Sequence, residues 1–310
     1  MITADDVRAA RETIGGDLHR TPVFSSRMLG PSIYLKAELF QRTGSFKPRG
    51  VLNKLRSLTE AERERGVIGV SAGNHAQALA WCARLEGLDA LLVMWQTASP
   101  AKVAATEAYG ADVDLAADGP ETVFDRLDQL IEETGRTLVH PFDDPLVAAG
   151  QGTVGLEIAE DVPEVDTVVV PVGGGGLVAG IAAALPATRI IGVEPSGSNA
   201  LTVGLAAGEP TRVSPRSIAD GLNAPFAGEL PIRVAREHGV QIVLVEEEEI
   251  EDGMRFLYGR AKLACEPAGA AAVAAIRAGK IPLDEGETVV AVVSGGNVLG
   301  QTAAAILARP

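Results

Sequence analysis

The sequence has few cysteines and too few basic residues to balance its acids. Its two cysteines, Cys82 and Cys265, each stand in an apolar, helix-like stretch rather than in a pair with the spacing of metal ligands. This pattern favours a reduced, intracellular setting, and we expect a cytoplasmic protein. The 27 Lys and Arg face 41 Asp and Glu, for a net charge of −14. Such a charge repels nucleic-acid phosphates and anionic membrane surfaces, so neither is expected as a partner.

The sequence also lacks a recognisable signal peptide. Residues 1–11 are charged and contain no apolar core, so export is not expected. Two stretches, 167–188 and 288–308, carry almost no charge and approach the length of a membrane span. Each consists of a valine-rich run, a Gly-Gly segment with polar or proline neighbours, and an alanine-rich run. We therefore expect a strand, a loop and a buried helix in each.

The chain is long enough for two domains. Its 310 residues, 46% of them hydrophobic, can bury a large core. Short β-branched runs alternate with alanine-rich helical patterns, which predicts an α/β fold with parallel strands. Strands are expected at residues 67–71, 91–94, 112–115, 137–139, 166–170, 189–193 and 289–293, and helices at 75–85, 99–110, 121–133, 151–159, 177–185, 250–263 and 267–278. We expect a small domain, residues 52–142, inserted into a large domain made of residues 1–51 and 143–310.

Lys47 is the candidate for chemistry at a fixed amine. It follows a Thr-Gly-Ser turn and precedes Pro48, which suits the first turn of a helix. A fixed, partly desolvated amine has a lowered pKa and can attack an aldehyde to form a Schiff base. An isolated lysine is usually a surface residue, so this interpretation depends on the other segments.

Three further segments lie where a strand is expected to end. The first, Ser71, Ala72, Gly73, Asn74 and His75, precedes a helix whose free N–H groups favour an anion such as an amino-acid carboxylate. The second, Gly173, Gly174, Gly175 and Gly176, is a phosphate cradle without the Walker or dinucleotide spacing. The third begins at Ser294, which brings a neutral hydroxyl to the ligand-binding edge of an α/β sheet.

Each of these signals also has a structural interpretation. The segment at 71–75 could be an ordinary helix start, and His75 could satisfy a hydrogen bond in the core. Glu266 and Glu194, acids beside prolines, are either site residues or satisfied structural carboxylates. The acidic run 246–249 is interpreted as a solvated helix start.

Taken together and in this order, the segments resemble the fold-type II pyridoxal-phosphate enzymes, and specifically the threonine/serine dehydratase and serine racemase family. The likeness spans nearly the whole chain. It includes residues 35–38, 43–50, 71–77, 140–145, 150–153, 173–176, 218–221 and 294–297. The implied fold has two domains with parallel-rich sheets covered by helices, as in the tryptophan synthase β-subunit.

The resemblance implies that the cofactor is pyridoxal 5′-phosphate and that Lys47 is the catalytic residue that holds it. Phe46 would pack on the pyridine ring, Asn74 would contact its 3-hydroxyl, and Ser294 would hydrogen-bond the ring nitrogen. The phosphate would be bound by Gly173, Gly174, Gly175, Gly176 and Leu177, and the substrate carboxylate by residues 71–75. Glu266 and Asn297 are further possible site residues. The implied reaction eliminates water from L-threonine or L-serine and gives 2-oxobutanoate or pyruvate plus ammonia.

The sequence departs from relatives of this family at three points. Racemising members carry a serine where this chain has Ala72, so racemase activity should be weak. Cation-binding members have an aspartate where this chain has Ala200, so no metal site is expected at Glu194. The chain ends at Pro310, so no regulatory domain and no inhibition by isoleucine are expected.

Several alternatives stay open from the sequence. The substrate could be a related hydroxyamino acid such as 3-hydroxyaspartate. A β-replacement synthase and a threonine synthase are also possible activities. The chain could instead be a non-catalytic ligand-binding module, or a nucleotide-binding protein that uses the glycine loop. The family resemblance also implies a homodimer.

Overall fold

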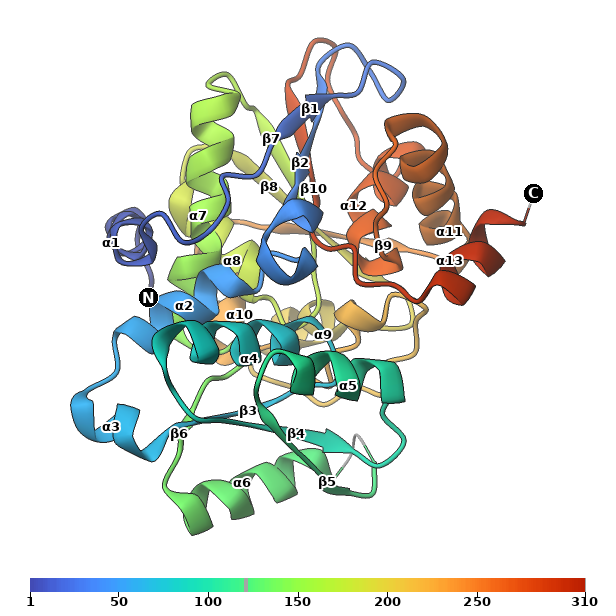
Figure 1. Cartoon of the computed structure of the whole chain (residues 1–310). Coiled ribbons are helices and arrows are strands. Elements are labelled where there is room, and N and C mark those ends of the chain that lie inside the picture. The colour runs from blue at the N-terminus through green and yellow to red at the C-terminus, as the bar shows by residue number, and fades with distance from the viewer. Residues whose placement is uncertain (120–121, 310) are drawn as a thin grey trace.

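A computed structural model describes residues 1–119 and 122–309 (Figure 1). Its described strands form a six-stranded sheet of order β1-β2-β10-β7-β8-β9 and a four-stranded sheet of order β5-β4-β3-β6. Neighbouring strands are parallel, except that β1 runs antiparallel to β2. The larger sheet contains β1 (Val23–Ser25), β2 (Ile33–Ala37), β7 (Thr167–Pro171), β8 (Arg189–Pro195), β9 (Gln241–Val245) and β10 (Val289–Val293); the smaller contains β3 (Val67–Val70), β4 (Ala90–Trp95), β5 (Asp112–Ala117) and β6 (Thr137–Leu138).

Helices cover both faces of the larger sheet, as parallel sheets require. Side chains alternate along β7, so that Val168 and Val170 point into one core and Val169 into the other. The first core includes residues of α1 (Ala4–Ile14), α7 (Pro145–Asp161), α8 (Gly176–Ala184), α9 (Ala200–Ala207) and α10 (Glu229–Glu237). The second includes residues of α11 (Glu247–Phe256), the π-helix η4 (Leu257–Ala261), α12 (Pro267–Arg277) and α13 (Gly300–Leu307).

The smaller sheet has a core on each face as well. Residues of α2 (Pro48–Arg56) and α4 (Asn74–Glu86) pack on one face, and residues of α6 (Val123–Thr134) pack on the other. The helices α3 (Glu60–Arg65) and α5 (Pro100–Ala108) and the 3-10 turns η1 (Glu38–Phe40), η2 (Arg42–Gly44) and η3 (Asp220–Leu222) complete the described elements. All four strands of this sheet come from one continuous stretch of chain, between β2 and β7 of the larger sheet (Figure 1).

The α/β class with parallel sheets is confirmed, and every strand predicted from the sequence is present. Two helices begin earlier than predicted. The helix predicted at 151–159 begins at Pro145, because the Asp144 side chain accepts the N–H groups of Leu146 and Val147. The one predicted at 250–263 begins at Glu247 and changes to a π-helix at Leu257. The predicted start of the helix at Glu121 lies outside the described residues.

The sequence patterns missed several elements. They are α1, β1, β2, α3, α9, α10 and β9. In β2 the apolar pattern is interrupted by Lys36, which is fully buried all the same. A charged residue inside a buried strand is rare unless it is paired, so pattern recognition alone passes over it.

The two stretches that are poor in charge form a strand, a loop and a helix each, as predicted. Residues 167–188 contain β7, the glycine loop and α8, whose residues are all buried. Residues 288–308 contain β10 and α13. In α13 only Ala303 and Ile306 are buried, so the prediction of a buried helix is wrong there. Across residues 1–119 and 122–309, no helix has both the length and the apolar character needed to span a bilayer.

Candidate active site

Lys47 lies immediately before α2, at the carboxyl-end edge of the larger sheet. The chain reaches it from β2 through a turn in which Thr43 and Gly44 both have positive φ angles, 59° and 74°. The half-buried Lys47 Nζ donates to the carbonyl of Pro141 at 2.9 Å and lies 5.1 Å from the centre of the Phe46 ring. Burial lowers the pKa of Lys47 to about 8, although the charge of Glu266 pulls the other way. The amine is therefore held in place and is partly neutral near physiological pH.

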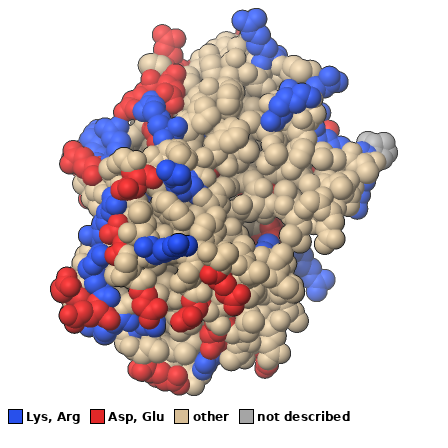
Figure 2. All heavy atoms as spheres, viewed as in Figure 1, with Lys and Arg blue, Asp and Glu red and all other residues tan. Residues whose placement is uncertain are grey.

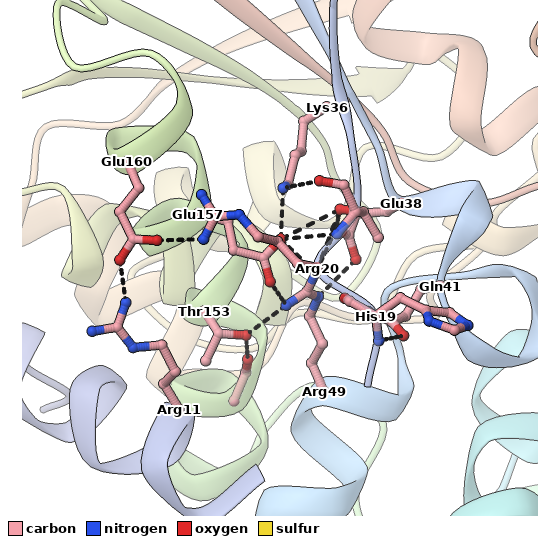
Figure 3. A network of polar contacts seen from close by, with 12 residues as sticks. Arg11, His19, Arg20, Lys36, Glu38, Gln41, Arg49, Thr153, Glu157 and Glu160 are labelled. Carbon is pink, nitrogen blue, oxygen red and sulfur yellow. Dashed lines mark hydrogen bonds and ion pairs between the residues drawn. The ribbon is translucent and has the colours of Figure 1, made fainter. Parts of the chain in front are cut away.

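A buried ionic cluster, consisting of Arg49, Lys36, Glu38 and Glu157, holds the helix that follows Lys47 (Figure 3). Arg49 donates from Nε to Glu38 Oε2 at 2.8 Å and from Nη1 to Glu157 Oε1 at 2.7 Å. The Lys36 Nζ donates to the same Glu157 at 2.6 Å. Burial by itself lowers the pKa of Arg49, but the charges of Glu38 and Glu157 outweigh it and hold that pKa above its usual value.

The segment predicted to bind a carboxylate lies between β3 and the start of α4. Gly73 occupies the cap position of α4, and no side chain caps the N–H groups of the first turn. A Cβ placed on Gly73 would meet no atom within 4 Å, so open space lies in front of this turn. Uncapped N–H groups at a helix start attract anions.

His75 faces the core instead of this open space. Its Nε2 lies 2.8 Å from the carbonyl of Val139, which can only accept, so Nε2 carries the proton. Burial lowers the pKa of His75 to about 3, and the charge of Lys47 adds to the fall. The imidazole is therefore neutral, and His75 contributes its backbone to the segment.

The glycine loop between β7 and α8 is tightly enclosed by protein on one side. A Cβ on Gly174 would lie 2.2 Å from the Phe142 ring, and one on Gly175 would lie 2.6 Å from Pro231. Gly175 also has a φ of +93°, which favours glycine, and it occupies the cap position of α8 without a side-chain cap. Gly173 and Gly176 complete the loop, and Leu177 lies in the first turn of α8. Uncapped N–H groups of α8 are thus available to a second anion.

Ser294 follows β10, next to the glycine loop. Because β10 and β7 are parallel neighbours, the residues after them meet at the same edge of the sheet. Ser294 is buried, and its carbonyl accepts the N–H of Phe46 at 3.2 Å. The N–H of Gly296 bonds to the carbonyl of Gly44 at 2.9 Å. The Ser294 segment is therefore joined directly to the Lys47 segment.

Asn74, Glu266 and Asn297 come together from three distant parts of the chain. Asn74 Nδ2 donates to Glu266 Oε1 at 2.7 Å, and Asn297 Nδ2 donates to Asn74 Oδ1 at 2.8 Å. Glu266 is buried, and burial raises its pKa to about 8, with a further rise from the charge of Asp220. Of the two acids left open by the sequence, Glu266 thus belongs to this cluster.

Glu194 has the structural role instead. Its carboxylate accepts the N–H of Leu201 at 2.7 Å and both the N–H and the hydroxyl of Thr202, at 2.9 and 2.6 Å. It therefore holds the start of α9. No group of three or more His, Cys, Asp and Glu side chains that could hold a metal ion exists among residues 1–119 and 122–309.

Sequence patterns did not single out the residues that support the glycine loop. Phe142 lies against Gly174, and His140 lies edge-on to Phe142 with ring centres 4.6 Å apart. Asp143 accepts the N–H groups of Glu229 and Leu230 and so begins α10, which packs against α8. These residues lie in the stretch 140–145, and only the family likeness marked it.

The architecture and the site are those of an enzyme that uses a phosphate-bearing aldehyde cofactor. The family model described as pyridoxal-phosphate dependent enzyme matches residues 15–295. The chain belongs to this family, and pyridoxal phosphate is confirmed as its cofactor.

Individual relatives agree with this assignment. An L-threonine ammonia-lyase of Thermotoga maritima is 42% identical over 307 residues, covering 96% of this chain and 76% of that protein. A Staphylococcus aureus protein named L-threonine dehydratase catabolic TdcB is 44% identical over 311 residues and covers 96% of this chain and 90% of its own.

Two solved structures are similar throughout. Maize serine racemase has a TM-score of 0.91 at 37% identity, covering 97% of this chain and 95% of that one. A threonine deaminase from the organism abbreviated T.th. has a TM-score of 0.88 at 39% identity, with coverages of 96% and 99%. The fold-type II assignment expected from the sequence is thereby confirmed.

Proposed function

We propose that this enzyme eliminates water from L-threonine or L-serine and releases a 2-oxo acid and ammonia. One observation carries the proposal: a held lysine of lowered pKa stands beside two uncapped helix starts, at α4 and α8. An α-amino acid brings a carboxylate, and the cofactor brings a phosphate, so the two anions match the two helix starts. The names of the relatives, threonine ammonia-lyase and threonine dehydratase, support the same reaction.

The residues present fit pyridoxal phosphate. Besides Lys47, the buried hydroxyls of Thr43 and Ser45 have no hydrogen-bond partner among the described residues, and both lie in the segment that leads to the lysine. We assign the phosphate to Gly173, Gly174, Gly175, Gly176 and Leu177, the ring face to Phe46, the ring nitrogen to Ser294 and the 3-hydroxyl to Asn74. When bound, the cofactor supplies an aldehyde for Lys47 and an electron-withdrawing system that loosens the Cα–H bond.

In this proposal the chain's own residues do three things. The first turn of α4, with residues 71–75, holds the substrate carboxylate and so fixes which bond at Cα is aligned for cleavage. The Lys47 amine, once free, takes the Cα proton; a pKa of about 8 keeps a useful fraction unprotonated. The β-hydroxyl then leaves as water. Ala72 offers no hydroxyl that could return a proton from the other side, which favours elimination over racemisation.

The visible spectrum and product formation test the proposal together. Wild-type protein should give an absorbance band near ~410 nm that depends on Lys47. Lys47→Ala should lose it, whereas the control Lys280→Ala should keep it, because that amine bonds to Leu244 and Glu249 instead. L-threonine, L-serine and L-threo-3-hydroxyaspartate are then added separately and the 2-oxo acid is measured. Product from hydroxyaspartate alone would replace the proposed substrates, and absence of any band would overturn the proposal.

We also propose the two-domain division expected from the sequence, with residues 52–142 as the small domain. The continuous origin of β3 to β6 supports it. Residues 1–51 and 143–310 would form the large domain. Limited proteolysis that cuts first near the two crossings between the sheets would support this division.

A homodimer in the cytoplasm completes the proposal. Phe24, Met28 and Phe40 are large apolar side chains that are 41%, 64% and 47% exposed on the edge of the larger sheet. Figure 2 shows a broad uncharged area in the upper half of one face, over the part built on that sheet. Exposed apolar patches of this kind often mark subunit contacts. The two free, buried cysteines agree with a reducing compartment. Light scattering of wild type and Phe24→Asp would test the dimer.

A further inference from the structure

The side-chain amide of Asn74 has one defined orientation. Asn297 Nδ2 lies 2.7 Å from the carbonyl of Thr43, and a carbonyl only accepts, so the Asn297 nitrogen must point there. The same Nδ2 lies 2.8 Å from an amide atom of Asn74, which must therefore be the oxygen. Asn74 Nδ2 is thus directed to Glu266 Oε1, at 2.7 Å. The orientation passes from a fixed backbone carbonyl to a buried acid.

Glu266 is confined as closely as Asn74. A Cβ on Gly295 would lie 2.5 Å from Glu266 Oε1, and one on Gly221 would lie 3.5 Å from it. The backbone N–H of Glu266 bonds to the carbonyl of Gly295 at 3.1 Å, just before α12 begins. With 3% of its surface exposed, the carboxyl has little freedom to turn away from Asn74.

The charges around Glu266 come from several elements. Asp220 of η3 and Lys102 of α5 form an ion pair with each other, and Cys265 is the preceding residue. Burial and Asp220 raise the pKa of Glu266 to about 8, while Asn74, Lys102 and the Asn297 N–H oppose the rise. Lys47 belongs to the same set, because the charge of Glu266 raises its pKa.

A change in the charge of Glu266 would therefore act at two places. A carboxylate holds the Asn74 amide more strongly than a neutral carboxyl does, since charge-assisted hydrogen bonds are shorter and stronger. The same negative charge stabilises the protonated form of Lys47. Both groups touch the cofactor in the proposed function.

We propose that Glu266 is a positioning residue that acts through Asn74 and makes the reactivity of Lys47 depend on pH. This inference rests on the proposed function, because it concerns the cofactor held by Lys47. Glu266 itself touches neither the substrate nor the cofactor in this proposal. It exchanges its proton with solvent, and the exchange changes the hold on Asn74.

The test compares Glu266→Gln with wild type in two measurements. The glutamine oxygen still accepts from Asn74 but has no proton to lose. The first measurement is the visible band of cofactor-loaded protein, titrated from neutral to alkaline pH. Wild type should show an inflection near pH 8, the pKa of Glu266, and Glu266→Gln should lose it. The second is the rate at which cofactor-free protein captures pyridoxal phosphate at pH 7, which should rise by up to about tenfold in Glu266→Gln as the lysine pKa falls.

Three further variants separate positioning from charge. Asn297→Ala should keep the inflection but bind the cofactor several-fold more weakly, because Asn74 loses its fixed orientation. Glu266→Asp, which keeps the acid, should keep an inflection at a shifted pH and serves if Glu266→Gln does not fold. Glu194→Gln removes another buried acid of raised pKa and should leave the titration unchanged.

Two results would count against this inference in different ways. Identical titrations for wild type and Glu266→Gln would overturn the role of Glu266 while the proposed reaction stands. Failure of wild-type protein to give any band would overturn the proposed function and this inference with it.

Discussion

Arg49 and Glu157 form a two-pronged ion pair inside the protein. Arg49 Nη1 lies 2.7 Å from Glu157 Oε1, and Nη2 lies 3.0 Å from Oε2. Arg49 belongs to α2 and Glu157 to α7, and Lys47 stands just before α2. The pair therefore holds the reactive lysine relative to the core of the larger sheet.

Arg49→Ala should destabilise the protein by about 3–5 kcal/mol, because it leaves Glu38 and Glu157 buried without their partner. Urea unfolding measures the loss. Arg11→Ala is the control, since Arg11 pairs with Glu160 at an exposed position and its loss should cost about 0–1 kcal/mol. Equal effects of the two substitutions would contradict a supporting role for the buried pair.

Gly174→Ala should weaken both stability and cofactor retention. The new Cβ would lie 2.2 Å from the Phe142 ring, and overpacking of this kind costs roughly 1–3 kcal/mol. The glycine loop would have to shift away from Phe142. Gly300→Ala, where a Cβ meets nothing within 4 Å, is the matched control. Calorimetry and dialysis against buffer without cofactor would measure the two effects, and a Gly174→Ala protein as stable and as yellow as the control would refute the prediction.

His75 should make the protein sensitive to mild acid. Its pKa is lowered from 6.5 to about 3, so the unfolded chain binds a proton between these pH values and the folded protein does not. Stability is therefore present at neutral pH and falls as the pH drops below about 6.5. From pH 7 to pH 5 the loss from this residue should be about 2 kcal/mol.

The difference between wild type and His75→Gln isolates this contribution. Glutamine keeps an N–H donor for Val139 but does not titrate. Urea unfolding at both pH values should show a smaller acid loss in the variant. The same loss in both proteins would mean that other groups, His140 among them, account for the acid sensitivity.

Ala72→Ser should raise racemisation of serine relative to dehydration. The substitution adds a hydroxyl next to the carboxylate-binding turn, where the resemblance to racemising members predicts an acid and base opposite Lys47. Chiral chromatography of D-serine alongside a 2-oxo acid assay gives the ratio. Ala72→Gly is the control, because it changes the same position without adding a proton donor. An unchanged ratio in Ala72→Ser would show that Ala72 does not limit racemisation.

Much of this architecture could be predicted because parallel strands have a strong local signature. Valine-rich runs followed by glycine and an alanine-rich helix identified β7, α8 and β10 without any structure. Lys47 could be selected because Pro48 predicts a helix start, and the glycine loop because four glycines exceed the needs of an ordinary turn. Each of these signals is contained within a short window of sequence, which is the range over which sequence patterns are informative.

The remaining features depend on contacts between distant residues. Asn74 and Asn297 are 223 positions apart, and Arg49 and Glu157 are 108 apart. No local pattern joins such pairs, and the buried Lys36 even weakens the pattern of its own strand. Whether Glu266 or Glu194 belonged to the site was likewise undecidable from sequence, because burial beside a proline is common to both. Only the fold places one against Asn74 and the other against α9.

The insertion of the smaller sheet into the chain of the larger one has a consequence for how the site can move. Lys47 and Asn297 are carried by the larger sheet's part of the chain, whereas Asn74 is carried by the smaller, and two crossings of the backbone connect the parts. A tilt of one part against the other would lengthen the Asn297–Asn74 bond while leaving each sheet intact. The amide pair thus acts as a strain gauge between the two halves, and its length in a substrate complex would report how far they have closed.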